Sequence, residues 1–275
     1  VWLSLDRSRS LALYAEKRFR RLYPAYAVVV VICALAALAV SDAARSNLGE
    51  VGEYLGWNLV FLNFLQPNLP GLFDHNPFHE VNGALWTLKI EVMFYVVLPF
   101  LAWAMRVAGK WRWLLLGLLY IGAETWRLCM TLYATDDSLF LELSRQLPGQ
   151  MSFFVVGIAL ACWRGNFSWS PMLAAAGFAL TALSAVFPAA EPFRALGLGI
   201  VVIWLSVGIP RLVDAARFGD LSYGLYIVHF PIIQTAIALG FFTGSLWQGA
   251  LVSVMASIVA ALLLWRLVEK IGRAH

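Results

Sequence analysis

Charged residues are scarce in this chain. Lys, Arg, Asp and Glu make up only 13% of its 275 residues, whereas hydrophobic residues make up 61%. A soluble domain carries about a quarter charged residues and cannot bury so large an apolar fraction. The composition therefore excludes a soluble globular protein and predicts an integral membrane protein.

Cysteine and histidine are also rare. The three cysteines each lie in an apolar run, which argues against a disulfide framework or a thiolate metal site. Of the four histidines, His75 and His79 share one polar segment, but Pro77 breaks the helix that would place both on one face. We therefore expect no metal site. The net charge of +4 is too small to indicate a nucleic-acid partner.

Long apolar runs account for most of the chain. Eight are long enough to cross a bilayer as tilted helices, at residues 25–40, 84–107, 111–128, 148–163, 169–187, 193–210, 218–239 and 247–267. We therefore expect an all-α fold, a polytopic transmembrane helical bundle of about eight spans that forms one integral-membrane domain over residues 1–275. The shorter, more polar segment 54–65 is predicted to lie at the membrane surface or to re-enter it.

The basic residues gather on one alternating set of connections between these runs, and most acidic residues fall on the other set. Short basic loops stay in the cytoplasm. Both ends of this chain are therefore predicted to be cytoplasmic, with residues 42–83 as the main external loop. The basic connections are expected to contact anionic membrane lipid.

The run at residues 84–107 contains two charges near its start. Thr87 and Glu91 share one helical face, and Lys89 points to the far side. Glu91 is predicted to lie on the order of 10 Å below the outer end of its helix, where an ionised carboxylate needs a partner or a wet cavity. Two interpretations stay open: a tie to another helix, for example through Arg127, or a functional cavity.

The stretch YAEKRFRRLYPAY, residues 14–26, places Arg18, Arg20 and Arg21 just before Pro24. A proline suits the first turn of a helix, so the next span is predicted to begin there. One interpretation is a topology signal that contacts lipid headgroups. The other is phosphate binding at a cytoplasmic mouth, because each guanidinium offers two parallel donors.

The stretch FGDLSYGLYIVHFPIIQ, residues 218–234, predicts a helix that Asp220 or Ser222 caps. Ser222, Tyr226 and His229 follow on one face, and Pro231 weakens the helix beside the histidine. A neutral histidine that is hydrogen-bonded between helices is one interpretation. A catalytic or proton-relay role is the other.

Together, the motifs RFRRLYP, LWTLKIEVMFYVVLPF and GDLSYGLYIVHFP resemble, in order and spacing, those of the membrane-bound acyltransferase-3 family, and the resemblance covers essentially the whole chain. It implies an inner-membrane O-acyltransferase that moves an acyl group, usually acetyl, from cytoplasmic acyl-CoA to a hydroxyl of a cell-surface or membrane-linked sugar. Acyl-CoA would be a substrate, with no bound cofactor. The family's paired arginines fall on Arg18 and Arg21, and its Trp-Ser-Leu-x-x-Glu pattern falls on residues 86–91, with Thr87 in place of Ser.

The resemblance also implies roles for single residues. Arg18 and Arg21, with help from Arg20, would bind the CoA phosphates, and Glu91, Thr87 and His229 are the candidate catalytic residues. The family has ten spans, and its first carries a histidine taken as the base, so we expect this chain to be an N-terminally truncated domain. Two alternatives stay open: a transporter whose route is lined by Glu91, Arg127 and His229, and a catalytically inactive remnant.

Overall fold

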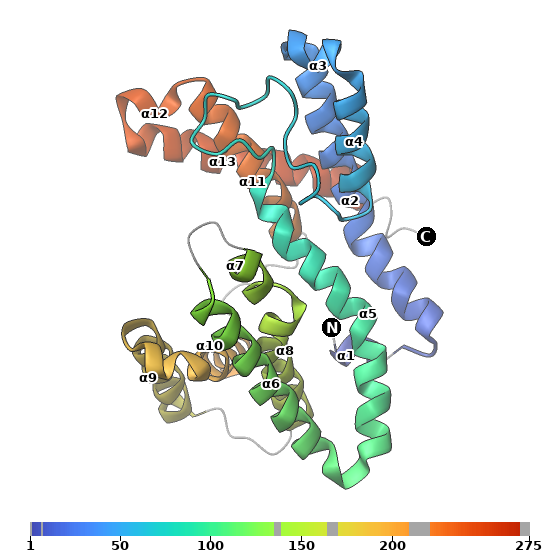
Figure 1. Cartoon of the computed structure of the whole chain (residues 1–275), viewed down its shortest axis with the longest axis vertical. Helices are drawn as coiled ribbons and strands as arrows, with labels where there is room; N and C mark the ends of the chain where they lie inside the picture. The colour runs from blue at the N-terminus through green and yellow to red at the C-terminus, as the bar shows by residue number, and fades with distance from the viewer. Residues whose placement is uncertain (1, 7, 135–138, 164–169, 209–220, 270–275) are drawn as a thin grey trace. The chain divides into compact units, whose positions relative to one another are not determined.

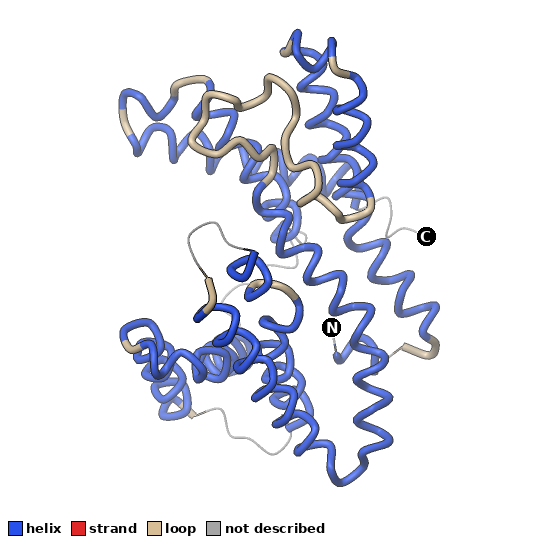
Figure 2. The backbone as a smooth tube through the Cα atoms, viewed as in Figure 1, coloured by secondary structure: helices blue, strands red, loops and turns tan. Residues whose placement is uncertain are grey.

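The computed structural model of the chain describes residues 2–6, 8–134, 139–163, 170–208 and 221–269. Within these ranges every regular element is a helix (Figure 1 and Figure 2), which confirms the predicted all-α fold. The chain forms two compact units. Unit 1 comprises Val1–Ser8 and Met93–Val213, and unit 2 comprises Arg9–Val92 and Asp214–His275.

Unit 2 is built around α11, which packs against α13 and also contacts α2. Its close approach to α13 depends on Gly224, where an added Cβ would lie 3.3 Å from the Ala261 Cα atom. The unit contains α2 (Leu11–Val40), α3 (Asp42–Ser46), α4 (Leu48–Leu59), η1 (Gly83–Leu85), the first part of α5 (Trp86–Ala108), α11 (Leu221–Ala238), α12 (Phe241–Gly244), α13 (Leu246–Leu264) and η7 (Trp265–Glu269).

Unit 1 is a bundle in which α8 packs between α6 and α10, and α10 also packs on α9. Buried Val156, Leu160 and Ala195 form part of its core. The unit contains α1 (Trp2–Asp6), the rest of α5, η2 (Gly109–Trp111), α6 (Arg112–Leu132), α7 (Leu139–Ser144), α8 (Leu147–Trp163), α9 (Pro171–Val186), η4 (Pro188–Phe193), α10 (Arg194–Ile203) and η5 (Trp204–Gly208).

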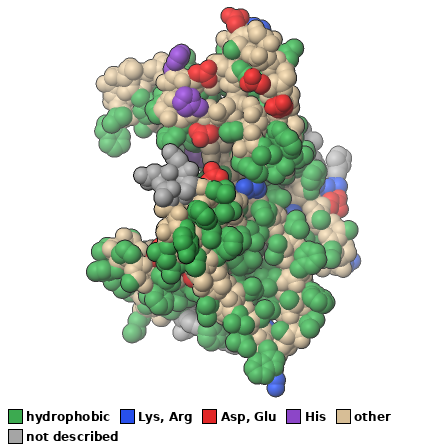
Figure 3. Space-filling model, in the orientation of Figure 1, with side chains coloured by type: hydrophobic (Ala, Val, Ile, Leu, Met, Phe, Trp, Pro, Cys, Tyr) green, Lys and Arg blue, Asp and Glu red, His purple; other side chains and the backbone are tan. Residues whose placement is uncertain are grey.

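The predicted membrane spans correspond to helices of the structure. Six helical stretches of the described chain are long and apolar enough to cross a membrane: Leu11–Val40, Gly83–Leu132, Leu139–Trp163, Pro188–Ser206, Leu221–Ala238 and Leu246–Val268. Gly83–Leu132 is one continuous run that includes two predicted spans, and the shorter apolar helix Pro171–Val186 corresponds to another. Hydrophobic side chains cover much of the visible surface in Figure 3, as expected where lipid replaces water.

The predicted start of the first span at Pro24 is wrong, because α2 begins at Leu11 and passes through the proline without ending. Ser10 caps the helix, since its hydroxyl oxygen accepts a hydrogen bond from the Leu13 amide at 3.2 Å. A proline inside a helix removes one amide donor, and buried side chains on both sides of it, such as Tyr14 and Tyr26, hold the helix to unit 2.

The segment 54–65 forms the end of α4 and the start of a long loop, residues 60–82. The Tyr26 hydroxyl on α2 donates a hydrogen bond to the Asn58 carbonyl at 2.6 Å. The Asn58 side chain in turn donates to the carbonyls of Tyr54 and Gln66, each at 2.9 Å. These bonds fix the end of α4 and the start of the loop against α2.

Candidate functional site

The described parts of the first and third sequence motifs belong to unit 2, and so does the second motif as far as Val92. Within this unit, α11 contacts the other two motifs through a pair of tyrosines. The Tyr223 hydroxyl donates a buried hydrogen bond to the Leu22 carbonyl on α2, at 2.8 Å. The Tyr226 hydroxyl bonds to the Ala84 carbonyl in η1 and to the Thr87 hydroxyl on α5. Residues three apart rise by about 4.5 Å along a helix, so α11 holds both motifs at nearly the same level.

The donors and acceptors around Tyr226 form a directed chain. The Ala84 carbonyl can only accept, so the Tyr226 hydroxyl donates its single proton there. With that proton donated to Ala84, the Tyr226 oxygen accepts from Thr87, whose hydroxyl also lies 3.4 Å from the Ala84 carbonyl. This arrangement leaves the Thr87 oxygen with lone pairs, which makes it an acceptor for a substrate hydroxyl.

Glu91 lies one helical turn beyond Thr87 on the same face of α5, as the sequence predicts. Its side chain is partly buried, and its carboxylate is close enough to interact electrostatically with the Tyr226 hydroxyl. Arg127, which the sequence offered as a partner for Glu91, forms an ion pair with Glu124 and a longer one with Glu191, at 3.7 Å, inside unit 1. Both carboxylate partners of Arg127 therefore belong to α6 and η4.

The orientation of His229 defines its tautomer. Its Nδ1 atom lies 2.8 Å from the Tyr226 carbonyl and 3.2 Å from the Leu225 carbonyl. Carbonyl oxygens only accept, so Nδ1 carries a proton. In the neutral ring, Nε2 then has the lone pair and is the atom that can accept a proton. The sequence offered a hydrogen bond between helices as one interpretation, whereas the bonds described at Nδ1 are to carbonyls of the same helix.

The polar loop 60–82 is attached to α11 by buried amides. The Gln234 side chain donates to the carbonyls of Phe78 and Glu80, at 2.7 and 2.9 Å, and accepts from the Asn76 side chain at 2.9 Å. The Asn82 amide group donates to the Ile227 carbonyl at 2.8 Å. These bonds hold the loop at the start of α5, beside the Thr87 and Tyr226 hydroxyls.

Acidic and histidine side chains gather over this loop and the neighbouring α3 and α4 in Figure 3. His75 and His79 are both exposed there. Within the described residues, no three His, Cys, Asp or Glu side chains are grouped so that they could hold a metal ion.

The arginines of α2 divide between two faces. At about 100° per residue, Arg18 and Arg21 lie about 60° apart, whereas Arg18 and Arg20 lie about 160° apart. Arg20 forms an ion pair with Glu16 at 2.7 Å, and about half of each side chain is exposed. The Arg18 guanidinium lies 5.8 Å from the ring centre of the buried Tyr14. Geometry therefore separates the pair Arg18 and Arg21 from Arg20.

Similarity to known proteins identifies the family of this chain. Residues 2–266 match the family model of the acyltransferase domain named acyltransferase-3. The chain belongs to the acyltransferase-3 family. It is thus an acyltransferase by family, and its apolar helices agree with a multi-pass membrane protein. A curated relative is nodulation protein 10 of Rhizobium leguminosarum bv. viciae, with 26% identity over 97% of this chain and 77% of the relative. No solved structure matches significantly.

In this acyltransferase-3 chain, sequence reasoning placed Thr87 and Glu91 correctly on one helical face. It placed Tyr226 on one face with His229 but did not predict that Tyr223 and Tyr226 connect the motifs. Tyr223 and Tyr226 occupy positions i and i+3 of one motif, and this spacing was the available signal. Sequence reasoning also missed Asn82, which is buried and only 6% exposed. The structure describes no hydrogen-bond partner for its Oδ1 atom. Asp220, one of the two expected caps, lies outside the described residues.

Proposed function

We propose that this chain transfers an acyl group, acetyl in the simplest case, from cytoplasmic acyl-CoA to a hydroxyl of a cell-surface or membrane-linked sugar. Membership of the acyltransferase-3 family supports acyl transfer. The donor and the acceptor come from the family resemblance of the sequence motifs. The protein would then lie in the inner membrane of the cell, with both ends of this chain in the cytoplasm.

The observation that carries the proposal is the double attachment of α11. Tyr223 bonds to α2 one residue beyond Arg21, and Tyr226 bonds to Thr87 about one turn further along α11. A cationic stretch suited to phosphates and a polar hydroxyl cluster are thus connected through one helix. A donor that carries phosphates as well as a thioester needs both kinds of group within one unit, and unit 2 contains both.

In the proposed reaction, the acceptor hydroxyl oxygen attacks the thioester carbonyl carbon. The carbon–sulfur bond breaks, the ester forms, and CoA leaves as a thiolate that takes up a proton. The lone pairs of Thr87 would orient the acceptor hydroxyl, and His229 Nε2 would take its proton. The Glu91 carboxylate would stabilise the positive charge that develops on the histidine.

Arg18 and Arg21 would bind the phosphates of the donor, because guanidinium groups form paired hydrogen bonds with phosphate oxygens. Arg20 already has a carboxylate partner on the opposite face. Its contribution to donor binding is therefore expected to be smaller than that of Arg18 or Arg21.

The test is donor binding and turnover by the full-length protein in proteoliposomes. CoA affinity is measured by calorimetry, and transfer is measured as release of free CoA thiol from acetyl-CoA in the presence of sugar acceptors. Arg18→Gln and Arg21→Gln should each weaken CoA binding about ten-fold or more, as expected for a lost charged hydrogen bond. Arg20→Gln removes a guanidinium that is paired with Glu16 and lies about 160° from Arg18, and it serves as the matched control.

Each outcome distinguishes between functions. Equal CoA affinity in Arg18→Gln, Arg21→Gln and Arg20→Gln would contradict the phosphate-binding role of the pair. Acceptor-independent solute uptake into vesicles without acyl-CoA, together with no CoA release, would contradict the enzyme and favour a transporter. If Thr87→Val and His229→Gln both leave CoA release unchanged, the proposed catalytic roles of Thr87 and His229 are wrong. The proposal that the chain is an acyltransferase would still hold.

A further inference from the structure

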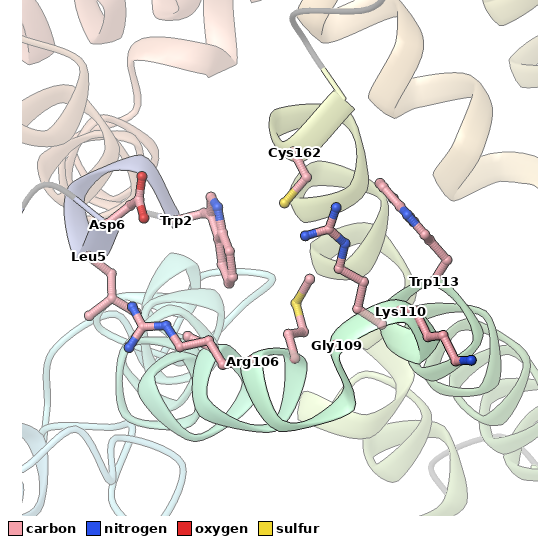
Figure 4. Close-up of a pocket in the computed structure, with 11 residues that line it drawn as sticks. Trp2, Leu5, Asp6, Arg106, Gly109, Lys110, Trp113 and Cys162 are labelled. Atoms are coloured by element: carbon pink, nitrogen blue, oxygen red, sulfur yellow. The ribbon is translucent and has the colours of Figure 1, made fainter.

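A second basic site lies in unit 1, where α5 ends and α6 begins. A cavity of about 420 Å³ opens there, and it is lined by Trp2, Leu5, Asp6, Ala102, Met105, Arg106, Gly109, Lys110, Arg112, Trp113 and Cys162. In Figure 4, Trp2 and Asp6 of α1 lie across the cavity from Cys162 of α8. None of these residues belongs to the three motifs discussed above.

The charge of this cavity is strongly positive. Arg106, Lys110 and Arg112 contribute three cations and Asp6 one carboxylate. Among the described residues, none of the three cations forms a salt bridge. A cluster of like charges repels itself unless an anion lies between them. The cavity is therefore suited to a ligand with one or two negative charges.

Two of these cations lie over the aromatic rings of the residues that follow them in the chain. The Arg112 guanidinium lies 5.5 Å from the Trp113 ring centre, and the Lys110 ammonium lies 5.5 Å from the Trp111 ring centre. Such contacts between cations and rings attract the basic group without neutralising its positive charge. The basic groups are thus partly ordered before any ligand binds.

The cavity lies at the level of lipid headgroups. Gly83–Leu132 is one helical run that contains two predicted spans, and the short η2 at Gly109–Trp111 joins them. A junction this short leaves the end of each span at the membrane boundary. The exposed rings of Trp111 and Trp113 agree with that position, because tryptophan prefers the headgroup layer.

The remaining walls are apolar: Ala102 and Met105 are buried, and Trp2 and Leu5 are partly buried. A small inorganic anion would leave this apolar surface in contact with water. A phospholipid supplies both a phosphate for the cations and acyl chains for the apolar wall. We propose that the cavity binds the phosphate group of an anionic phospholipid such as phosphatidylglycerol.

This site does not depend on the proposed acyl transfer. The shared chemistry is that of a phosphate ester, which a soluble donor such as CoA also carries. The test must therefore separate a lipid phosphate from a soluble one, and it must report on this cavity alone because α2 carries another group of arginines.

Cys162 provides a local readout, because it is exposed and lines the cavity. The full-length protein in detergent is treated with a maleimide, and the labelling of each cysteine is followed by peptide mass spectrometry. Dioctanoyl phosphatidylglycerol should slow labelling of Cys162, and dioctanoyl phosphatidylcholine should do so much less. Cys129, which is partly buried on α6 outside the cavity, should be unaffected by either lipid.

Substitutions should shift the lipid concentration that gives half-maximal protection. Arg106→Gln and Arg112→Gln should each raise it about five-fold, the usual contribution of one basic residue near anionic lipid. Asp6→Asn should lower it, because it removes the one carboxylate among those lining residues that the structure describes. Arg145→Gln, which removes an exposed charge of unit 1 outside the cavity, is the matched control and should change nothing.

Two results would overturn the proposal. Equal protection by the anionic and the zwitterionic lipid, in wild type and variants, would show apolar adsorption without phosphate recognition. Protection by CoA or inorganic phosphate but not by phosphatidylglycerol would assign the site to a soluble phosphate. The opposite shifts expected for Asp6→Asn and the arginine variants separate a binding effect from a general loss of folding, which would move all variants in one direction.

Discussion

Replacing Tyr226 with Phe removes one oxygen atom from the hydroxyl chain between α11 and α5. The Ala84 carbonyl loses its donor and Thr87 loses its acceptor. An interhelical hydrogen bond in a membrane protein contributes about 0.6 kcal/mol on average. Thr87 can still donate to the Ala84 carbonyl, from which it lies 3.4 Å away. The free energy of unfolding is therefore expected to fall by only about 1 kcal/mol.

The effect of Tyr226→Phe on acyl transfer should be larger than its effect on stability. Once the Thr87 hydroxyl turns toward Ala84, its lone pairs no longer hold the acceptor in place. A displacement of about 1 Å at a reacting group can reduce turnover about 100-fold. We therefore expect kcat to fall about 10-fold to 100-fold, with little change in CoA affinity.

The assay is release of CoA thiol in proteoliposomes, together with thermal unfolding of each variant. Tyr120→Phe is the matched control, since the Tyr120 hydroxyl likewise bonds to one carbonyl, that of Pro192, but inside unit 1. It should lose similar stability and keep its turnover. A double-mutant cycle of Tyr226→Phe with Thr87→Val should show non-additive losses in kcat. Additive losses, or an equal effect of Tyr120→Phe on turnover, would refute the reasoning.

Further predictions concern the packing of unit 2. Gly83→Ala would place a Cβ atom 2.8 Å from the Phe230 ring and should lower the free energy of unfolding by about 1–3 kcal/mol. Gly56→Ala, whose added Cβ would meet nothing beyond its own helix backbone within 4 Å, is the control and should leave the free energy of unfolding unchanged or raise it. Equal shifts of the two variants in thermal unfolding would contradict this prediction. Gln234→Ala would leave two loop carbonyls without a donor and should cost about 2–3 kcal/mol and speed proteolysis within residues 60–82. Gln146→Ala, which loses one exposed bond, is its control, and similar cleavage rates would argue against the attachment of the loop.

The membrane fold could be predicted from the sequence because it depends on composition along the chain. A bilayer requires long apolar runs with their backbone groups paired within the helix, so each predicted run contains a helix. The start of α2 could not be read in the same way. Pro24 resembled a first-turn proline, but the Ser10 cap and the burial of Tyr14 extended the helix past it.

The candidate site was predicted only in part. The sequence placed Thr87 and Glu91 on one face, because that depends on the helical repeat alone. It also grouped Arg20 with Arg18 and Arg21, and the structure separates them by the ion pair with Glu16. Neighbours along the chain can thus lie on different faces, and a run of like residues does not reveal this.

By itself, the sequence determined that this protein is a helical membrane protein and which stretches carry its polar chemistry, because hydropathy and helical periodicity are local properties. Only the tertiary structure showed that α11 joins α2 to α5 through Tyr223 and Tyr226, and that Nδ1 of His229 faces carbonyls of its own helix. The first feature depends on contacts between residues far apart in the chain, and the second depends on the orientation of one side chain. Neither follows from hydropathy or helical periodicity.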